Sequence, residues 1–133
     1  MITTKGRYAL IVMLDLAEQK PEEFVPLKEI ATRQGLSKKY LEIVLKVLVQ
    51  NELLKCAMGK GGGYRLTRKP AEYTVGEILE LAEGTLSEVP CLQSENNPCE
   101  KKFQCRTLPI WEKFNKLKHD FFYSVTLKDL LEN

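Results

Sequence analysis

Three of the four cysteines lie close together in the chain, and their chemistry suits a metal. Cys91, Cys99 and Cys105 are separated by seven and then five residues, in and beside the polar segment 85–104. Soft thiolates are preferred ligands of iron–sulfur clusters and of zinc. No two of the cysteines are separated by only two residues, so the spacing is not that of a zinc ribbon or a thioredoxin-like site. Spacing alone leaves three alternatives open: a metal site, redox-active thiols, and incidental cysteines.

The other residues that could act as metal ligands or nucleophiles are isolated. Cys56 lies among apolar residues in a predicted strand, where a buried structural thiol is expected. His119 is the only histidine; it follows the cysteines by four helical turns and is expected at the surface. The chain has no Cys–His pair, no phosphate-binding glycine motif on a strand–helix unit, and no metal-hydrolase motif. The sequence therefore argues against an enzyme.

A second group of residues has the chemistry to bind nucleic acid. The segment 27–67 predicts a helix, a tight turn at Gly35, a second helix capped by Ser37, and a β-hairpin. The second helix directs a regular apolar stripe toward the core: Leu41, Val44, Leu45 and Leu48. Its outer face is then formed by Lys38, Lys39, Tyr40, Glu42 and Lys46. That is the face that a recognition helix presents to the DNA major groove.

The predicted hairpin has strands at 52–57 and 64–67 and a glycine-rich turn between them. Lys60 at the tip, with Arg65 and Arg68 beyond it, suits phosphate or minor-groove contact. A helix-turn-helix followed by such a hairpin is a winged helix. A structural helical hairpin with a flexible glycine loop is the alternative. The residues expected to contact DNA, including some from the two preceding helices, are Lys5, Arg7, Lys28, Ser37, Lys38, Lys39, Tyr40, Glu42, Lys46, Gly59, Lys60, Gly61, Gly62 and Arg65.

Charge is concentrated in the same segment. The net charge of the 133-residue chain is only +2, but residues 27–69 carry ten basic and three acidic side chains, whereas residues 70–133 carry seven basic and eleven acidic ones. A solvated basic face would not predict this coincidence with the helix-turn-helix pattern. No apolar run approaches the roughly 20 residues of a membrane helix, and no signal peptide is seen, so a cytoplasmic protein is expected.

Helices are predicted on both sides of this segment. The first, from Lys5 to about Gln19, would be capped by Thr4; its expected apolar stripe is Tyr8, Leu10 or Ile11, Met13, Leu14 and Ala17. After the hairpin, a capping box at 74–77 opens a helix that Gly84 ends. A long helix then begins at 107–109 and a short one at 126. The long helix carries an aromatic stripe, expected to pack on the first helix or on a second subunit: Trp111, Phe114, Leu117 or Lys118, Phe121 and Val125.

Four stretches of the chain resemble the Rrf2 family of bacterial winged-helix regulators. They are 4–9 (TKGRYA), 36–42 (LS, then YLE), 61–64 (GGGY) and 126–130 (TL, then DL). The resemblance spans nearly the whole chain and implies a mainly α fold with a small β-hairpin: a winged helix-turn-helix domain at 1–70, then a cysteine-loop and dimerisation region at 71–133 with a long C-terminal helix. It also implies a homodimer that binds a near-palindromic site in double-stranded DNA.

Cluster-binding members of this family carry three cysteines in the loop before the dimerisation helix, and Cys91, Cys99 and Cys105 match that position. The resemblance thus implies an iron–sulfur cluster, of either 2Fe–2S or 4Fe–4S type. Three features depart from the family pattern. The first gap is longer than the usual five residues, a histidine ligand found three residues after the last cysteine is here Leu108, and Met58 replaces a basic wing residue. The fourth ligand could be Glu95 or Glu100, a residue of the other subunit, or an exogenous molecule.

The expected function is therefore a repressor or other transcription regulator that senses iron–sulfur status, or redox or nitrosative stress, through a cluster on a three-cysteine loop. The first alternative is a metal-free, thiol-based regulator. A second, from another class, is an iron–sulfur carrier or protein-interaction module that does not bind DNA.

Overall fold

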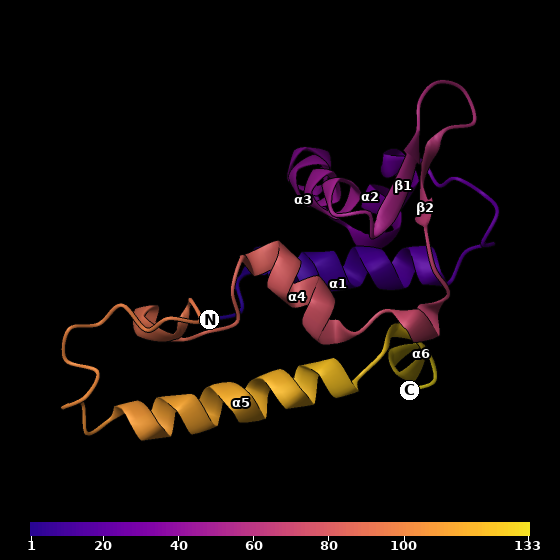
Figure 1. The fold of residues 1–133 in the computed structure, drawn as a ribbon. Coiled ribbons are helices and arrows are strands. Elements are labelled where there is room, and N and C mark those ends of the chain that lie inside the picture. Colours follow the sequence, from indigo (N-terminus) through magenta and orange to yellow (C-terminus); the bar gives the residue numbers. More distant parts are fainter.

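Six α-helices and one β-hairpin make up the computed structural model, which describes all residues from 1 to 133 (Figure 1). In chain order they are α1 (Thr4–Ala17), α2 (Leu27–Gln34), α3 (Lys38–Gln50), β1 (Leu54–Ala57), β2 (Gly63–Leu66), α4 (Val75–Glu83), α5 (Leu108–Ser124) and α6 (Leu127–Leu131), with short 3₁₀ turns η1 (Pro70–Glu72) and η2 (Pro90–Leu92). This confirms the predicted fold class: a mainly α winged helix-turn-helix followed by a long C-terminal helix.

The helix-turn-helix forms because two local residues stop one helix and start the next. Gly35 ends α2 with a φ of 65°, a left-handed conformation that a Cβ would oppose. Ser37 then caps α3 by accepting a hydrogen bond from the backbone N–H of Tyr40 at 3.4 Å. The predicted apolar stripe of α3 is fully buried and fixes which face of the helix points outward: Leu41, Val44, Leu45 and Leu48.

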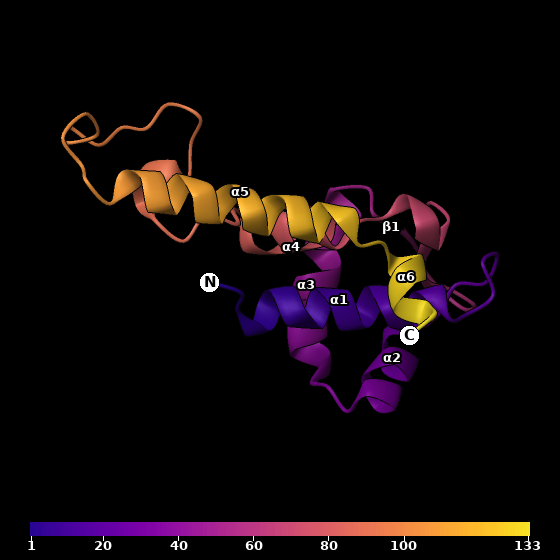
Figure 2. The same ribbon diagram turned by 90° about the horizontal axis from the view of Figure 1, so that it is seen from below.

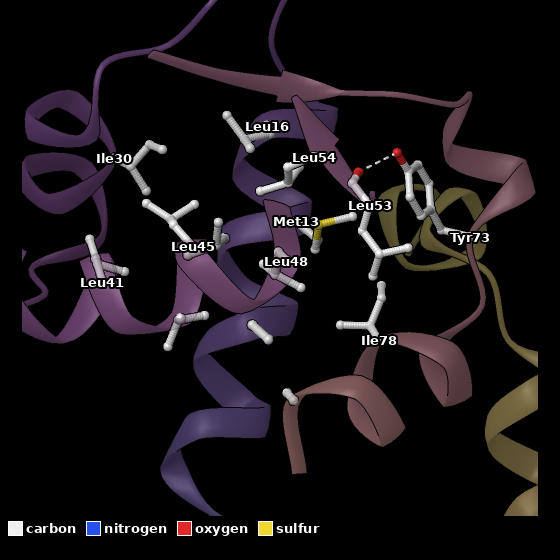
Figure 3. Packing of buried hydrophobic residues seen from close by; sticks show 14 of the residues in the cluster. Met13, Leu16, Ile30, Leu41, Leu45, Leu48, Leu53, Leu54, Tyr73 and Ile78 are labelled. Atoms are coloured by element: carbon white, nitrogen blue, oxygen red, sulfur yellow. Dashed lines mark hydrogen bonds between the residues drawn. The ribbon is translucent and has the colours of Figure 1, made fainter. Parts of the chain in front are cut away.

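The core joins α1, α3 and the base of the hairpin to α4 (Figure 3). Tyr73, between the hairpin and α4, is fully buried, and its hydroxyl donates to the carbonyl of Leu53 at 2.7 Å. The same hydroxyl accepts the backbone N–H groups of Thr67 at 2.9 Å and Arg68 at 3.0 Å. Because a buried polar group is costly unless it is paired, these bonds hold the base of the wing in register with the second half of the chain.

The structure corrects the predicted first helix. Thr3, not Thr4, precedes α1, and the helix ends at Ala17 rather than near Gln19. Of the predicted stripe, only Met13 is fully buried. The side chains of α1 that the structure buries are Ala9, Val12, Met13, Asp15 and Leu16. Residues 8–17 are apolar at every position except Asp15, so the periodicity did not single out one face. The face that packs is the one where a small residue allows close approach and where a charged residue finds a partner.

That charged residue is Asp15, whose side chain is only 2% exposed. Arg33 on α2 donates two hydrogen bonds to its carboxylate, Nη2 to Oδ1 at 2.8 Å and Nε to Oδ2 at 3.0 Å. Gln34 donates a third, at 2.8 Å to Oδ2. The hydrogen bonds to Asp15 also raise the pKa of Arg33 above its ordinary value. The carboxylate therefore sets the position of α2 relative to α1.

The second half of the chain packs on α1 through α4 and α6. Thr74 caps α4 by accepting the N–H of Glu77 at 3.1 Å, but only this half of the predicted capping box forms. The carboxylate of Glu77 pairs instead with Arg68 at 2.8 Å, because the guanidinium is a stronger partner than a backbone N–H. Gly84 ends α4 with a φ of 85°, as predicted.

α5 lies alongside α4, with most of its length away from α1 (Figures 1 and 2). Gly76 allows this approach, since a Cβ there would overlap the ring of Tyr123. The Tyr123 hydroxyl donates to Glu80, and burial with this carboxylate raises the pKa of Tyr123 to about 12. Val125 packs inward with α4, contrary to its place in the predicted stripe. The opposite side of α5 leaves five large apolar residues exposed: Ile110, Trp111, Phe114, Leu117 and Phe121.

Candidate nucleic-acid interface and cysteine segment

The outer face of α3 carries lysines that have no acidic partner. Lys38, Lys39 and Lys46 are exposed and none of them forms a salt bridge. Glu42 is exposed on the same helix, one turn before Lys46. Tyr40 differs from these residues because its ring packs edge-on against Tyr8 of α1, with centroids 5.1 Å apart. The helix therefore presents unpaired positive charge to the outside.

The wing is held in one position by its glycines. Gly59 and Gly61 have positive φ values of 83° and 79°, which lets the turn close with a hydrogen bond from the N–H of Gly62 to the carbonyl of Gly59 at 3.0 Å. Gly63 lies against the backbone of Val25, where a Cβ would overlap the carbonyl. That approach lets Val25 and Tyr64 exchange two backbone hydrogen bonds, of 2.8 and 2.9 Å. The wing is thus bound on both edges of β2.

Some side chains on the wing are exposed, and others are bonded to neighbouring parts of the chain. Lys60 is exposed at the tip, beside Met58, which is 90% exposed. Arg65 lies over the ring of Phe24 at 4.4 Å and donates to the carbonyl of Glu22 at 3.1 Å. Arg68, proposed from the sequence as a DNA contact, is bound to Glu77 and lies over Tyr73 instead. Its role in the structure is to join the wing to α4.

Cys56 on β1 is exposed, which corrects the expectation of a buried thiol. It lies on the same side of the strand as the buried Leu54. Burial on this side of β1 stops between Leu54 and Cys56, and the hairpin extends beyond the helices (Figure 1). The apolar neighbours in the sequence indicated a strand but not how far along it burial continues.

The remaining predicted DNA contacts lie on the first two helices. Lys5 and Arg7 are in the first turn of α1, where Arg7 donates to Thr4 Oγ1 at 3.1 Å. Lys28 is exposed at the start of α2. Of the ten basic residues in 27–69, only Arg33 and Arg68 form salt bridges. The other eight basic residues of this segment form no salt bridge, so their charge is available to an anionic partner.

The cysteine segment, residues 85–105, lies between α4 and α5, at the end of α5 farthest from the C-terminus (Figures 1 and 2). Cys91 is in η2, and the N–H of Cys99 donates to Asn97 Oδ1 at 2.9 Å. All three thiols are free and partly exposed. The chemistry of three thiols in one segment fits an iron–sulfur cluster. In this conformation, no three His, Cys, Asp or Glu side chains are arranged to hold a metal ion.

Cys105 differs from the other two cysteines of the segment because its thiol lies next to a hydroxyl group. Its Sγ lies 3.3 Å from the hydroxyl of Thr107, just before the first turn of α5. Hydrogen bonds from the Thr107 side chain and from the backbone N–H groups of Thr107 and Leu108 lower the pKa of the Cys105 thiol. His119 is exposed on the same helix and stacks on Tyr123 with centroids 4.3 Å apart, so its predicted surface position is confirmed.

Comparison with known proteins gives one consistent result. The family described as Rrf2, an iron-dependent transcriptional regulator, matches residues 2–133. The HTH-type transcriptional regulator IscR of Pectobacterium atrosepticum is 35% identical over 132 residues, 99% of this chain and 79% of that protein. Among solved structures, CymR, the global cysteine regulator of B. subtilis, has a TM-score of 0.77 and 33% identity over 98% of this chain and 95% of its own. IscR of T. potens has a TM-score of 0.75 and 36% identity over 99% and 86%. No helix of this chain has the length and apolar character needed to cross a membrane.

Proposed function

This chain belongs to the Rrf2 family of transcriptional regulators, and on that premise we propose that it is a homodimer that binds a near-palindromic DNA site and senses iron–sulfur or redox status through its cysteine segment. The observation that carries the DNA-binding part is the unpaired charge of α3 beside a rigid wing. Lys38, Lys39 and Lys46 serve as phosphate contacts, and Glu42 accepts a hydrogen bond from a cytosine amino group in the major groove.

The proposed dimer rests on the exposed face of α5. Ile110, Phe114, Leu117 and Phe121 recur at steps of four, three and four residues, so they form one stripe along the helix. All four are exposed in the single chain. A contiguous exposed stripe of four large apolar side chains is unusual on a monomer and typical of an interface. A second copy of α5, crossing the first, covers the stripe and places two recognition helices on one DNA duplex.

The proposed cluster would be held by Cys91, Cys99 and Cys105. The support is the thiol donor set and the resemblance to IscR of Pectobacterium atrosepticum and T. potens. When bound, the cluster supplies a centre that reacts with oxygen or nitric oxide. Binding of the cluster would require a conformational change, because the three cysteines must come closer to one another than they are in this structure. The cluster can shift the equilibrium between the DNA-binding and non-binding conformations by no more than the difference in its binding free energy for the two.

Anaerobic purification tests the cluster directly. We expect brown protein that contains iron and acid-labile sulfide in near-equal amounts, and we expect both to be lost when the three segment cysteines are replaced by serine. Cys56→Ser is the matched control, since Cys56 lies on the wing and should leave iron and sulfide unchanged. Colourless wild-type protein from iron-replete cells would contradict the cluster proposal and leave the DNA-binding proposal standing.

Replacing Lys39 by alanine should weaken binding to every DNA sequence and reduce the slope of log affinity against log salt by about one unit, because one phosphate contact is lost. Fluorescence anisotropy with a mixed-sequence duplex and with a duplex selected from a random library measures both effects. Lys113→Ala is the control, because Lys113 is an exposed lysine of α5 without a salt bridge. An unchanged slope in Lys39→Ala would rule out this assignment.

A metal-free thiol sensor is the second candidate, favoured by the surroundings of Cys105. A lowered pKa increases the thiolate fraction at neutral pH, and the thiolate is the reactive form. We expect Cys105→Ser to remove the fastest-reacting thiol in a stopped-flow assay with a disulfide reagent at pH 7. Thr107→Val, which removes the hydroxyl that lies 3.3 Å from the sulfur, should slow that phase. If the fast phase persists in Cys105→Ser, this candidate loses its support.

A further inference from the structure

The start of α1 is capped by a residue far away in the sequence. Thr3 precedes the helix but its side chain caps no N–H of the first turn. The carboxylate of Glu83, the last residue of α4, takes that place. Its Oε1 accepts the backbone N–H of Thr3 at 2.9 Å and that of Gly6 at 2.9 Å. The Thr3 hydroxyl donates to the same carboxylate, at 2.8 Å to Oε1 and 2.9 Å to Oε2. A negative group at a helix N-terminus is favourable on electrostatic grounds as well.

Gly6 makes this arrangement possible. A Cβ at Gly6 would overlap Oε1 of Glu83 and would approach Cδ and Cγ to 3.1 and 3.2 Å. Gly6 lies within α1 and does not have a positive φ. Glycine is unfavourable within a helix, so the backbone conformation does not explain its presence. The space taken by the Glu83 carboxylate does.

The capped turn is also the one that carries basic residues without acidic partners. Lys5 and Arg7 flank Gly6, and neither forms a salt bridge. Ile2, just before the helix, packs against the cluster that contains Leu86. The N-terminal segment is therefore held by 83–86, the residues that lead from α4 into the cysteine segment. Figure 1 shows the N-terminus beside this part of the chain.

From these contacts we propose that Glu83 is the positioning residue that holds the first turn of α1, with Lys5 and Arg7, in place for contact with DNA phosphate. This rests on the proposed DNA-binding function. Glu83 itself does not touch DNA, and as an anion it repels phosphate. Positioning and simple electrostatics therefore predict opposite effects of removing it, which makes the two accounts separable by experiment.

Binding to a mixed-sequence duplex, measured over a range of salt concentrations on full-length protein, tests the proposal. Glu83→Ala should weaken binding about tenfold near 0.1 M salt and lower the salt slope by about one unit, because at least one phosphate contact is lost. Glu83→Gln should bind nearly as well as wild type, since its amide oxygen can still accept from Thr3 and Gly6. Gly6→Ala, which displaces the carboxylate, should reproduce the loss.

Two comparisons separate positioning from a general loss of stability. Once Glu83 is alanine, replacing Lys5 and Arg7 by alanine should weaken binding by less than the same replacements do in the wild type, because residues that act through one another are not additive. Glu112→Ala removes the same charge from an exposed site on α5 that has no salt bridge, and it should leave binding unchanged or slightly tighter. All variants are assayed at a temperature at which circular dichroism shows them folded.

The outcomes distinguish this inference from the function on which it rests. If the wild-type protein shows no salt-dependent DNA binding, the proposed function itself fails. If the wild type binds normally but Glu83→Ala keeps its slope, or binds more tightly, only the role of Glu83 is overturned. Full additivity between Glu83→Ala and the Lys5 and Arg7 replacements would overturn that role as well.

Discussion

Replacing Arg33 by methionine should lower the free energy of unfolding by about 3 kcal/mol, because it leaves the buried carboxylate of Asp15 without its cation. Gln34 would then be the only side chain that still donates to that carboxylate. This loss lies at the low end for a broken buried pair, because the Arg33 side chain is 38% exposed and water screens its charge. Urea denaturation followed by circular dichroism measures the change.

Adding a second replacement at Asp15 should raise the stability of Arg33→Met, whereas a simple loss of packing would lower it further. Adding Asp15→Leu to Arg33→Met removes the stranded charge and fills its place with apolar atoms, so the double variant should be more stable than Arg33→Met alone. Lys28→Met is the control on the same helix; this exposed residue forms no salt bridge, and its replacement should change stability by no more than about 0.5 kcal/mol. A double variant less stable than Arg33→Met would show that the buried pair is not what holds α2 to α1.

The parts of the fold that were predicted from the sequence are those set by neighbouring residues. Gly35 and Ser37 mark the turn of the helix-turn-helix, and the stripe of α3 has clear helical spacing. The glycines at 59 and 61–63 mark the wing in the same way. Each of these features depends on backbone conformation or capping within a few residues. The structure therefore confirms them with only small shifts in the element boundaries.

The parts that were missed depend on pairs distant in the chain. Asp15 and Arg33 are 18 residues apart, and Gly6 and Glu83 are 77 apart. Each pair did leave a local anomaly: a charged residue within an apolar helix, and a glycine within a helical turn. Such anomalies show that a partner exists but cannot identify it. For the same reason, the spacing of the three cysteines indicates ligand chemistry but not the conformation that would bring the thiols together.

The largest effect on function is expected from the exposed stripe of α5. Phe114→Glu places a charge in the middle of the proposed dimer interface, so the protein should become monomeric. Binding to a palindromic duplex should then weaken by about a hundredfold or more, because two linked recognition helices bind with an avidity that one lacks. Folding should not change, since Phe114 is already 45% exposed in the single chain. Sedimentation equilibrium gives the mass, and fluorescence anisotropy gives the affinity.

Charge alone would also weaken DNA binding, so the control must change charge equally. Lys113→Gln shifts the net charge by the same amount at an exposed neighbour on α5 and should leave the protein dimeric. Its affinity should fall only slightly, as expected for a screened charge far from the recognition helix. A duplex with a single half-site sharpens the comparison, because Phe114→Glu and wild type should bind it with similar affinity. If Phe114→Glu remained dimeric and kept its affinity for the palindrome, the stripe would need another partner, and α5 could not be the element that sets the spacing of the two recognition helices.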